Sequence, residues 1–162
     1  MKKLLLPMLA ITVLFSVSAV AFAQSGAKQQ PQIQRDAELE KDSLHNLEVA
    51  RHYFKTRKAY VAALQRSEEI IAANPAFSRI DEALFMAGQS SLNLAEGKGR
   101  QKSTLYVIHE GETKKTLTAE QFRELARGFF TQLVKSYPES SFRGQAADAL
   151  RTLGGKAVSS KQ

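Results

Sequence analysis

The chain of 162 residues contains no cysteine. It can therefore form no disulfide, and it cannot carry the lipid that bacterial lipoproteins attach to a cysteine. In an oxidising compartment its stability has to come from apolar packing alone. The length is sufficient for one domain with a hydrophobic core.

Histidine is also scarce, with three residues in the chain, His45, His52 and His109. His45 and His52 lie seven residues apart, two turns along one helix face with Glu48 between them, which is more typical of a solvated face than of a metal site. The sequence has no glycine-rich phosphate loop, no nucleophile elbow and no zinc-protease motif. We therefore predict that the protein is not an enzyme and binds no metal or cofactor.

Acidic residues are fewer than basic ones, 16 against 23, which gives a formal net charge of +7. The excess is scattered and indicates at most weak attraction to anionic polymers or lipid headgroups. The segment "RHYFKTRK" (51–58) interleaves basic and aromatic residues, as some single-strand nucleic-acid binders do. Its aromatic residues are needed on the apolar face of a helix, so we predict no nucleic-acid partner.

The first 23 residues have the features of a secretory signal peptide. Lys2 and Lys3 supply the positive start, residues 4–20 form an apolar run without charge, and small residues precede the expected cleavage site between Ala23 and Gln24. We therefore expect export into a bacterial periplasm. An uncleaved segment that anchors the protein in the inner membrane is the alternative, because the apolar run is nearly long enough to span a bilayer.

Composition divides the remaining chain into three parts. Residues 24–36 are rich in glutamine without an apolar period and are predicted to be a disordered tether, and residues 156–162 a disordered tail. Residues 37–155 carry apolar side chains at helical spacing, with an insertion at 97–117. Helices are expected at about 42–56, 59–74, 78–95, 118–137 and 140–155.

Capping side chains and helix-breaking residues mark the expected helix ends. The clearest start is "TAEQF" (118–122), in which Thr118 and Gln121 can form a capping box. The other expected starts and stops are, in chain order, Asp42 or Ser43, Pro75, Ser78, Pro138, Ser140 or Ser141, and Gly154 with Gly155.

The second and fourth expected helices are related by a shift of 63 residues. The shift aligns Ala63 with Ala126, Ser67 with Phe130, Ile70 with Leu133 and Pro75 with Pro138. Similar positions define the second helix of a tetratricopeptide repeat, where a small residue admits the paired helix and proline ends the unit. Ser67 departs from this pattern, because a large residue is expected there. The sequence predicts an all-α fold, a short solenoid of two tetratricopeptide-like helix pairs with the last helix as a cap.

Two segments resemble a narrower family. "LEVARHYFKTRKAYVAALQRSEEII" (47–71) and "FFTQLVKSYPESSFRGQAADAL" (129–150) are similar to parts of the outer-membrane-assembly lipoproteins of the BamD type. The resemblance implies a periplasmic repeat protein that acts as a scaffold for other proteins. The chain lacks that family's lipidated cysteine and has two repeats where the family has about five. We therefore do not expect it to have that family's specific role in assembling outer-membrane proteins.

The insertion at 97–117 is too long for an ordinary turn between the helices of a repeat. It begins with the basic loop "GKGRQK", and "TLYVIHEGETKKTL" then predicts a small β-hairpin centred on Glu110-Gly111. We expect Leu105, Tyr106 or Val107 to pack against the helices, since a lone hairpin is marginally stable. Binding of an anionic polymer at the cell wall or membrane surface is the alternative function, through Lys98, Arg100, Lys102, Lys114 and Lys115.

The first helix of each pair lines the concave groove in the repeat family, and the resemblance therefore implies a partner-binding groove. Its residues here would be His45, Glu48, His52, Lys55, Glu82, Phe85, Gln89, Leu92 and Asn93. Phe85 and Leu92 would be apolar anchors for a protein partner, or else be buried beneath the insertion or the last helix. We predict a periplasmic scaffold for a protein partner of the cell envelope, with homo-oligomerisation possible if the capping helix leaves apolar surface open.

Overall fold

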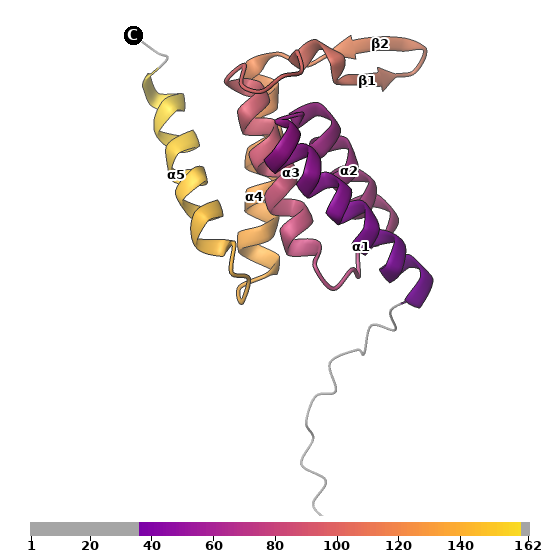
Figure 1. The fold of residues 1–162 in the computed structure, drawn as a ribbon. Coiled ribbons are helices and arrows are strands. Elements are labelled where there is room, and N and C mark those ends of the chain that lie inside the picture. Colours follow the sequence, from indigo (N-terminus) through magenta and orange to yellow (C-terminus); the bar gives the residue numbers. More distant parts are fainter. Residues whose placement is uncertain (1–35, 160–162) are drawn as a thin grey trace, which may run out of the picture. The chain divides into compact units, whose positions relative to one another are not determined.

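A computed structural model describes residues 36–159, with side chains described as far as residue 154 (Figure 1). The described chain is mostly helical and carries one small antiparallel hairpin, as the sequence predicts. The predicted signal peptide 1–23 with its cleavage site at Ala23 and Gln24 lies outside the described residues, as do residues 24–35 of the predicted tether. None of the helices between residues 36 and 159 has the length and apolar character needed to cross a membrane.

The first helix begins earlier than the sequence pattern predicts. Helix α1 spans Ala37–Arg51 and continues as a π-helix, η1, over His52–Arg57. Its N-cap is Asp36, whose carboxylate accepts hydrogen bonds from the backbone N–H of Glu38 (2.9 Å) and Leu39 (3.2 Å). The expected cap at Asp42 or Ser43 is therefore wrong, and the last residue of the predicted tether belongs to the fold. Ser43 is instead buried, and its hydroxyl accepts a hydrogen bond from the Asn74 side-chain amide (3.1 Å).

The next two helices follow the prediction closely, except at one cap. Helix α2 spans Tyr60–Ala73 and ends before Pro75, and α3 spans Ile80–Ala95. Ser78 does not cap α3: the cap position is Arg79, which makes no capping side-chain hydrogen bond. The backbone N–H of Ser78 donates to the side chain of Glu40 in α1 instead.

The insertion forms a short 3-10 helix, η2 (Ser103–Leu105), and then a hairpin of β1 (Val107–Glu110) and β2 (Thr113–Thr116). Glu110 pairs with Thr113, so the turn residues are Gly111 and Glu112, one position later than predicted. Gly111 has φ 62°, a left-handed conformation that suits glycine at a tight hairpin turn.

The last two helices test one start signal and one stop signal. Helix α4 spans Ala119–Ser136, and both hydrogen bonds of the Thr118–Gln121 capping box are present, which confirms that prediction. Helix α5 spans Arg143–Ser159 and runs through Gly154 and Gly155, so the predicted stop is wrong. Residues 156–159, which were predicted to belong to a disordered tail, are therefore the last residues of α5.

The buried apolar side chains form two clusters, which together involve all five α-helices and the insertion. One part joins α1 to α5 through Leu47, Leu84, Phe130, Leu133 and Leu153. The other joins α2, α3, the insertion and α4 through Tyr60, Leu64, Leu94, Tyr106 and Phe122. In Figure 1 α3, α4 and α5 follow one another, α1 lies in front of α2 on the other side of α3, and the hairpin projects at the end where α3 finishes and α4 begins.

Small side chains are buried where the helices approach most closely. Ala63, Ser67 and Ala126 are fully buried. The Ser67 hydroxyl donates to the backbone carbonyl of Ala63 (2.9 Å), so a serine is accommodated where the repeat pattern calls for a large residue. Gly88 lies directly against the ring of Phe130, and a Cβ there would be 2.5 Å from a ring carbon. These contacts depend on the absence of bulk in α2, α3 and α4.

Candidate partner-binding surface

An open depression of about 380 Å³ lies on the outer face of α1 and η1. It is lined by His45, Glu48, Val49, His52, Tyr53 and Arg57. The depression therefore contains three of the predicted groove residues, His45, Glu48 and His52. It also contains Val49, Tyr53 and Arg57, which the sequence analysis did not select.

Helical periodicity explains why this face is open. Leu47 and Ala50 are fully buried against the neighbouring helices, so the residues roughly opposite them on α1 point outward. The chain then changes to π-helical winding at His52, which alters the direction of the following side chains. Leu44 is 39% exposed on the same helix, so α1 presents apolar as well as polar side chains to solvent.

The predicted groove residue Glu82 is not free to meet a partner. It is buried, and its carboxylate accepts hydrogen bonds from Arg51 Nε (2.6 Å), Arg51 Nη2 (2.8 Å) and Arg79 Nη2 (2.6 Å). Burial opposes ionisation of this carboxyl, but the hydrogen bonds and charges of the two arginines outweigh burial and lower its pKa. Glu82 thus joins α1 to α3 as part of the fold, and its predicted place among the groove residues open to a partner is wrong.

The predicted anchor Phe85 is covered in part by the chain leading into α5. Its ring stacks on Phe142 with the centroids 4.9 Å apart and the planes at 22°, and it also meets Phe130 at 6.2 Å. Leu92 is half-buried against the same part of the core. Of the two alternatives for Phe85, contact beneath the last helical segment is therefore the one observed.

The other predicted groove residues occupy different positions. Gln89 and Asn93 are half-buried on α3, where the Asn93 side-chain amide donates to the backbone carbonyl of Gln89 (2.8 Å). Lys55 is exposed on η1. No α3 residue lines the depression on α1 and η1, so the structure does not gather the nine predicted residues into this one hollow.

Tyr106 attaches the insertion to the helices, as one of the three expected packing residues. Its hydroxyl lies 2.8 Å from Glu68 Oε1 and 3.1 Å from Oε2, and its ring meets Phe122 edge-on at 5.5 Å. Burial raises the pKa of both Tyr106 and Glu68, and the hydrogen bond from Tyr106 partly offsets the rise for Glu68. Leu105 is 59% exposed and does not share this role.

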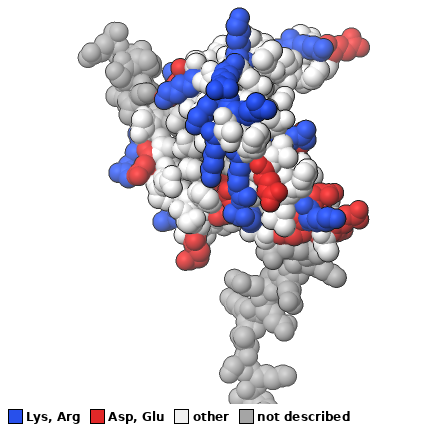
Figure 2. Space-filling view, in the orientation of Figure 1, with Lys and Arg blue, Asp and Glu red and all other residues white. Residues whose placement is uncertain are grey.

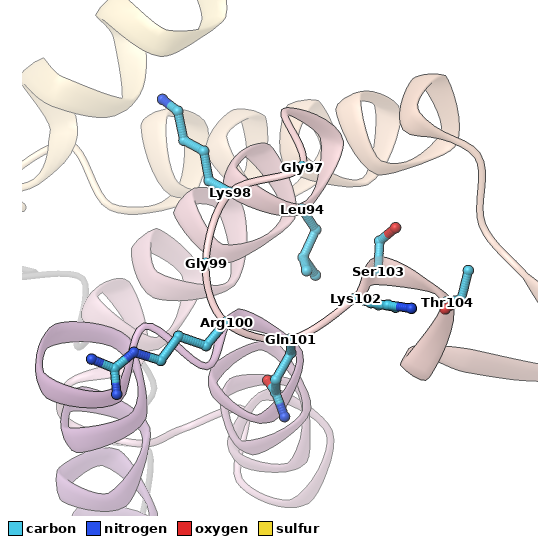
Figure 3. Close-up of a pocket in the computed structure, with 9 residues that line it drawn as sticks. All are labelled: Leu94, Gly97, Lys98, Gly99, Arg100, Gln101, Lys102, Ser103 and Thr104. Atoms are coloured by element: carbon cyan, nitrogen blue, oxygen red, sulfur yellow. The ribbon is translucent and has the colours of Figure 1, made fainter.

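The basic side chains of the insertion do not converge on one pocket. A hollow of about 410 Å³ is lined by Leu94 and residues 97–104, and Figure 3 shows Lys98 and Arg100 directed away from it. Lys98 pairs with Glu96 (2.7 Å), and Lys115 with Glu110 (3.4 Å). Lys114 is exposed on β2, and Lys102 is exposed before η2. This hollow is therefore not a charged site for a small anion.

The two proline turns, at residues 74–78 and 137–141, lie next to each other. Aligning the chain with itself did not predict this proximity. An open hollow of about 390 Å³ is lined by residues of both turns, Phe77 and Ser78 from one and residues 136–140 from the other. The Ser140 hydroxyl donates to Asp81 Oδ2 (2.7 Å) and accepts from the backbone N–H of Phe142 (3.2 Å). Because α5 begins at Arg143, neither Ser140 nor Ser141 occupies its cap position, and the predicted cap is wrong. Ser140 instead closes the turn before α5 and ties it to α3.

The described part of the chain contains no group of three or more histidine, aspartate or glutamate side chains placed to hold a metal ion. Comparisons with protein-family models, with curated proteins and with solved structures each find no match to this chain. The features from which a function can be proposed are therefore structural ones: an array of helices, one hairpin insertion and an open depression on α1 and η1.

Proposed function

We propose that this protein is a binding scaffold of the bacterial cell envelope, exported to the periplasm, which holds a segment of a partner protein. The observation that carries the proposal is the open depression on α1 and η1. It combines the apolar side chain of Val49 and the aromatic ring of Tyr53 with the polar side chains of His52 and Arg57. Protein-binding surfaces favour this combination of aromatic and arginine side chains with a polar rim.

The arrangement of the helices supports a tetratricopeptide-like scaffold. Two helix pairs, α1 with α2 and α3 with α4, follow one another along the chain and are followed by α5. Small residues lie at the close contacts, and the apolar side chains of α5, Ala146 and Leu153, are buried against the preceding helices. An array of this kind presents preformed side chains and loses little conformational entropy when a partner binds.

The proposed binding surface differs from the groove expected by family resemblance. Because Glu82 is paired and Phe85 is stacked on Phe142, the α3 side offers fewer free side chains than the α1 side. We therefore assign partner binding to His45, Glu48, Val49, His52 and Tyr53. The apolar charge-free run at residues 4–20 supports export, and with it a partner in the envelope.

Site-specific photocrosslinking in cells tests this proposal. A photoreactive phenylalanine derivative replaces Tyr53, which is half-buried in the depression, and separately replaces Gln145, which is exposed on α5. We expect one discrete adduct from position 53 that is absent from position 145, and we expect Val49→Asp to reduce that adduct. The same adducts from both positions, or an adduct from position 53 that Val49→Asp leaves unchanged, would contradict the proposal.

A further inference from the structure

The fold brings two separate basic segments of the sequence into contact. The loop after α3 lies against the end of η1, where the backbone N–H of Arg100 donates to the carbonyl of Lys58 (2.9 Å). Lys55 precedes Lys58 by three residues, and Lys98 precedes Arg100 by two. We call the four side chains Lys55, Lys58, Lys98 and Arg100 the basic patch. Figure 2 shows lysine and arginine side chains gathered on one face, over the end of α1, η1 and this loop.

The backbone at this junction has positive φ angles at two residues, one on each of the segments in contact. Lys58 has φ 52°, in the left-handed region that lysine seldom occupies, and Gly99 has φ 94°. A Cβ at Gly99 would lie 2.6 Å from the Lys58 carbonyl oxygen and 2.5 Å from the Tyr60 ring, so only glycine fits. The close approach of the two segments is thus built into the fold.

The patch carries little compensating negative charge. Lys98 pairs with Glu96, whereas none of the ion pairs within residues 36–159 involves Lys55, Lys58 or Arg100. Like charges that are brought together without partners repel one another and attract a polyanion. Lys98 and Arg100 point away from the hollow that their loop lines (Figure 3), and Lys55 and Lys58 are exposed. The complementary ligand is therefore extended and carries many negative charges.

We propose that the basic patch docks the protein on a membrane surface that contains anionic lipid. Leu105 in the same insertion favours a membrane over a soluble polyanion, because it is 59% exposed and can enter the headgroup region. The patch shares no residue with the depression on α1 and η1, and its proposed role goes beyond the proposed scaffold function.

Co-sedimentation with lipid vesicles tests the proposal. The chain starting at Gln24, the form that signal cleavage would leave, is mixed with phosphatidylcholine vesicles with or without phosphatidylglycerol. We expect binding only with phosphatidylglycerol, weakening as salt rises. Each basic residue near such a surface contributes about fivefold to binding. The triple variant Lys55→Gln, Lys58→Asn and Arg100→Gln should therefore bind on the order of 100-fold more weakly.

A matched control removes the same charge from other exposed sites. The control carries Lys41→Gln, Lys135→Gln and Arg143→Gln, at positions that make no ion pair in the described chain. Circular dichroism verifies that both triple variants keep the helical content of the parent chain. We expect the control to bind within a few-fold of the parent. An equal loss in both variants would overturn the proposal, because net charge alone would then explain binding.

A second comparison separates a membrane from a soluble polyanion. Leu105→Ser should weaken vesicle binding by about fivefold, because less apolar surface enters the headgroup region. Binding of the same variant to soluble polyphosphate or polyglutamate should not change. Absence of binding to phosphatidylglycerol vesicles would overturn the membrane proposal. So would tighter binding to polyphosphate or polyglutamate with no effect of Leu105→Ser, which would identify a soluble polyanion or an acidic protein as the ligand.

Discussion

Two helical glycines provide a sensitive test of how α3 packs against α4. Gly88 lies in α3 under the ring of Phe130, and a Cβ added there would be 2.5 Å from ring carbon Cε1. Gly128 lies in α4, and a Cβ added there would meet nothing within 4 Å. Alanine at either position removes the same helix penalty of about 1 kcal/mol. The two substitutions therefore differ only in the contact that the new methyl group makes.

The expected stabilities follow from these contacts. Ordinary carbon contacts need about 3.5 Å, so Gly88→Ala has to displace the Phe130 ring by about 1 Å in a fully packed core. Overpacking of this kind costs about 1–3 kcal/mol. After the gain in helix propensity, Gly88→Ala should destabilise the protein by about 1 kcal/mol. Gly128→Ala should stabilise it by up to about 1 kcal/mol.

Urea unfolding monitored by circular dichroism measures the difference. With a slope typical of a domain this size, the two midpoints should lie about 1 M urea apart, with Gly128→Ala the higher. Adding Phe130→Leu to Gly88→Ala should recover part of the loss, because the smaller side chain leaves room for the methyl group. If Gly88→Ala is as stable as Gly128→Ala, the ring does not lie over α3 as described and the reasoning fails.

Three further predictions concern individual polar contacts. Tyr106→Phe removes the hydroxyl that donates to Glu68, so amide exchange should speed up in the hairpin while the urea midpoint changes little. Glu82→Gln should cost about 2 kcal/mol at pH 7, because Arg51 is then left partly buried without its charged partner. The pKa of Glu82 is lowered in the fold, so its stabilisation is present above the usual carboxyl pKa and is lost as the pH falls through the folded pKa. The gap between Glu82→Gln and the parent in urea unfolding should therefore shrink at low pH, and a constant gap would contradict the ion pair. Thr118→Ala should lower the free energy of unfolding by about 1 kcal/mol through loss of the cap, and an unchanged urea midpoint would count against the capping box.

The sequence could predict the parts of the fold that depend on neighbouring residues. Apolar spacing located the helices, Pro75 marked the end of α2, and Thr118 with Gln121 marked the start of α4. These signals work because helix geometry and capping involve residues within one or two turns. The errors at helix ends concern signals of the same local kind. Asp36 caps α1 in place of Asp42 or Ser43, and α5 continues through Gly154 and Gly155.

Only the tertiary structure decided which candidate residues are available for binding. Whether Glu82 is open to a partner depends on Arg51, 31 positions away in sequence, and whether Phe85 is open depends on Phe142. The contact of Lys58 with Arg100 likewise joins two segments that the sequence presents as unrelated. The sequence by itself determined a helical chain with a basic, hairpin-bearing insertion and an apolar start. Packing of the helices decided which side chains remain exposed for binding, because contacts between distant residues depend on how the helices meet and not on local periodicity.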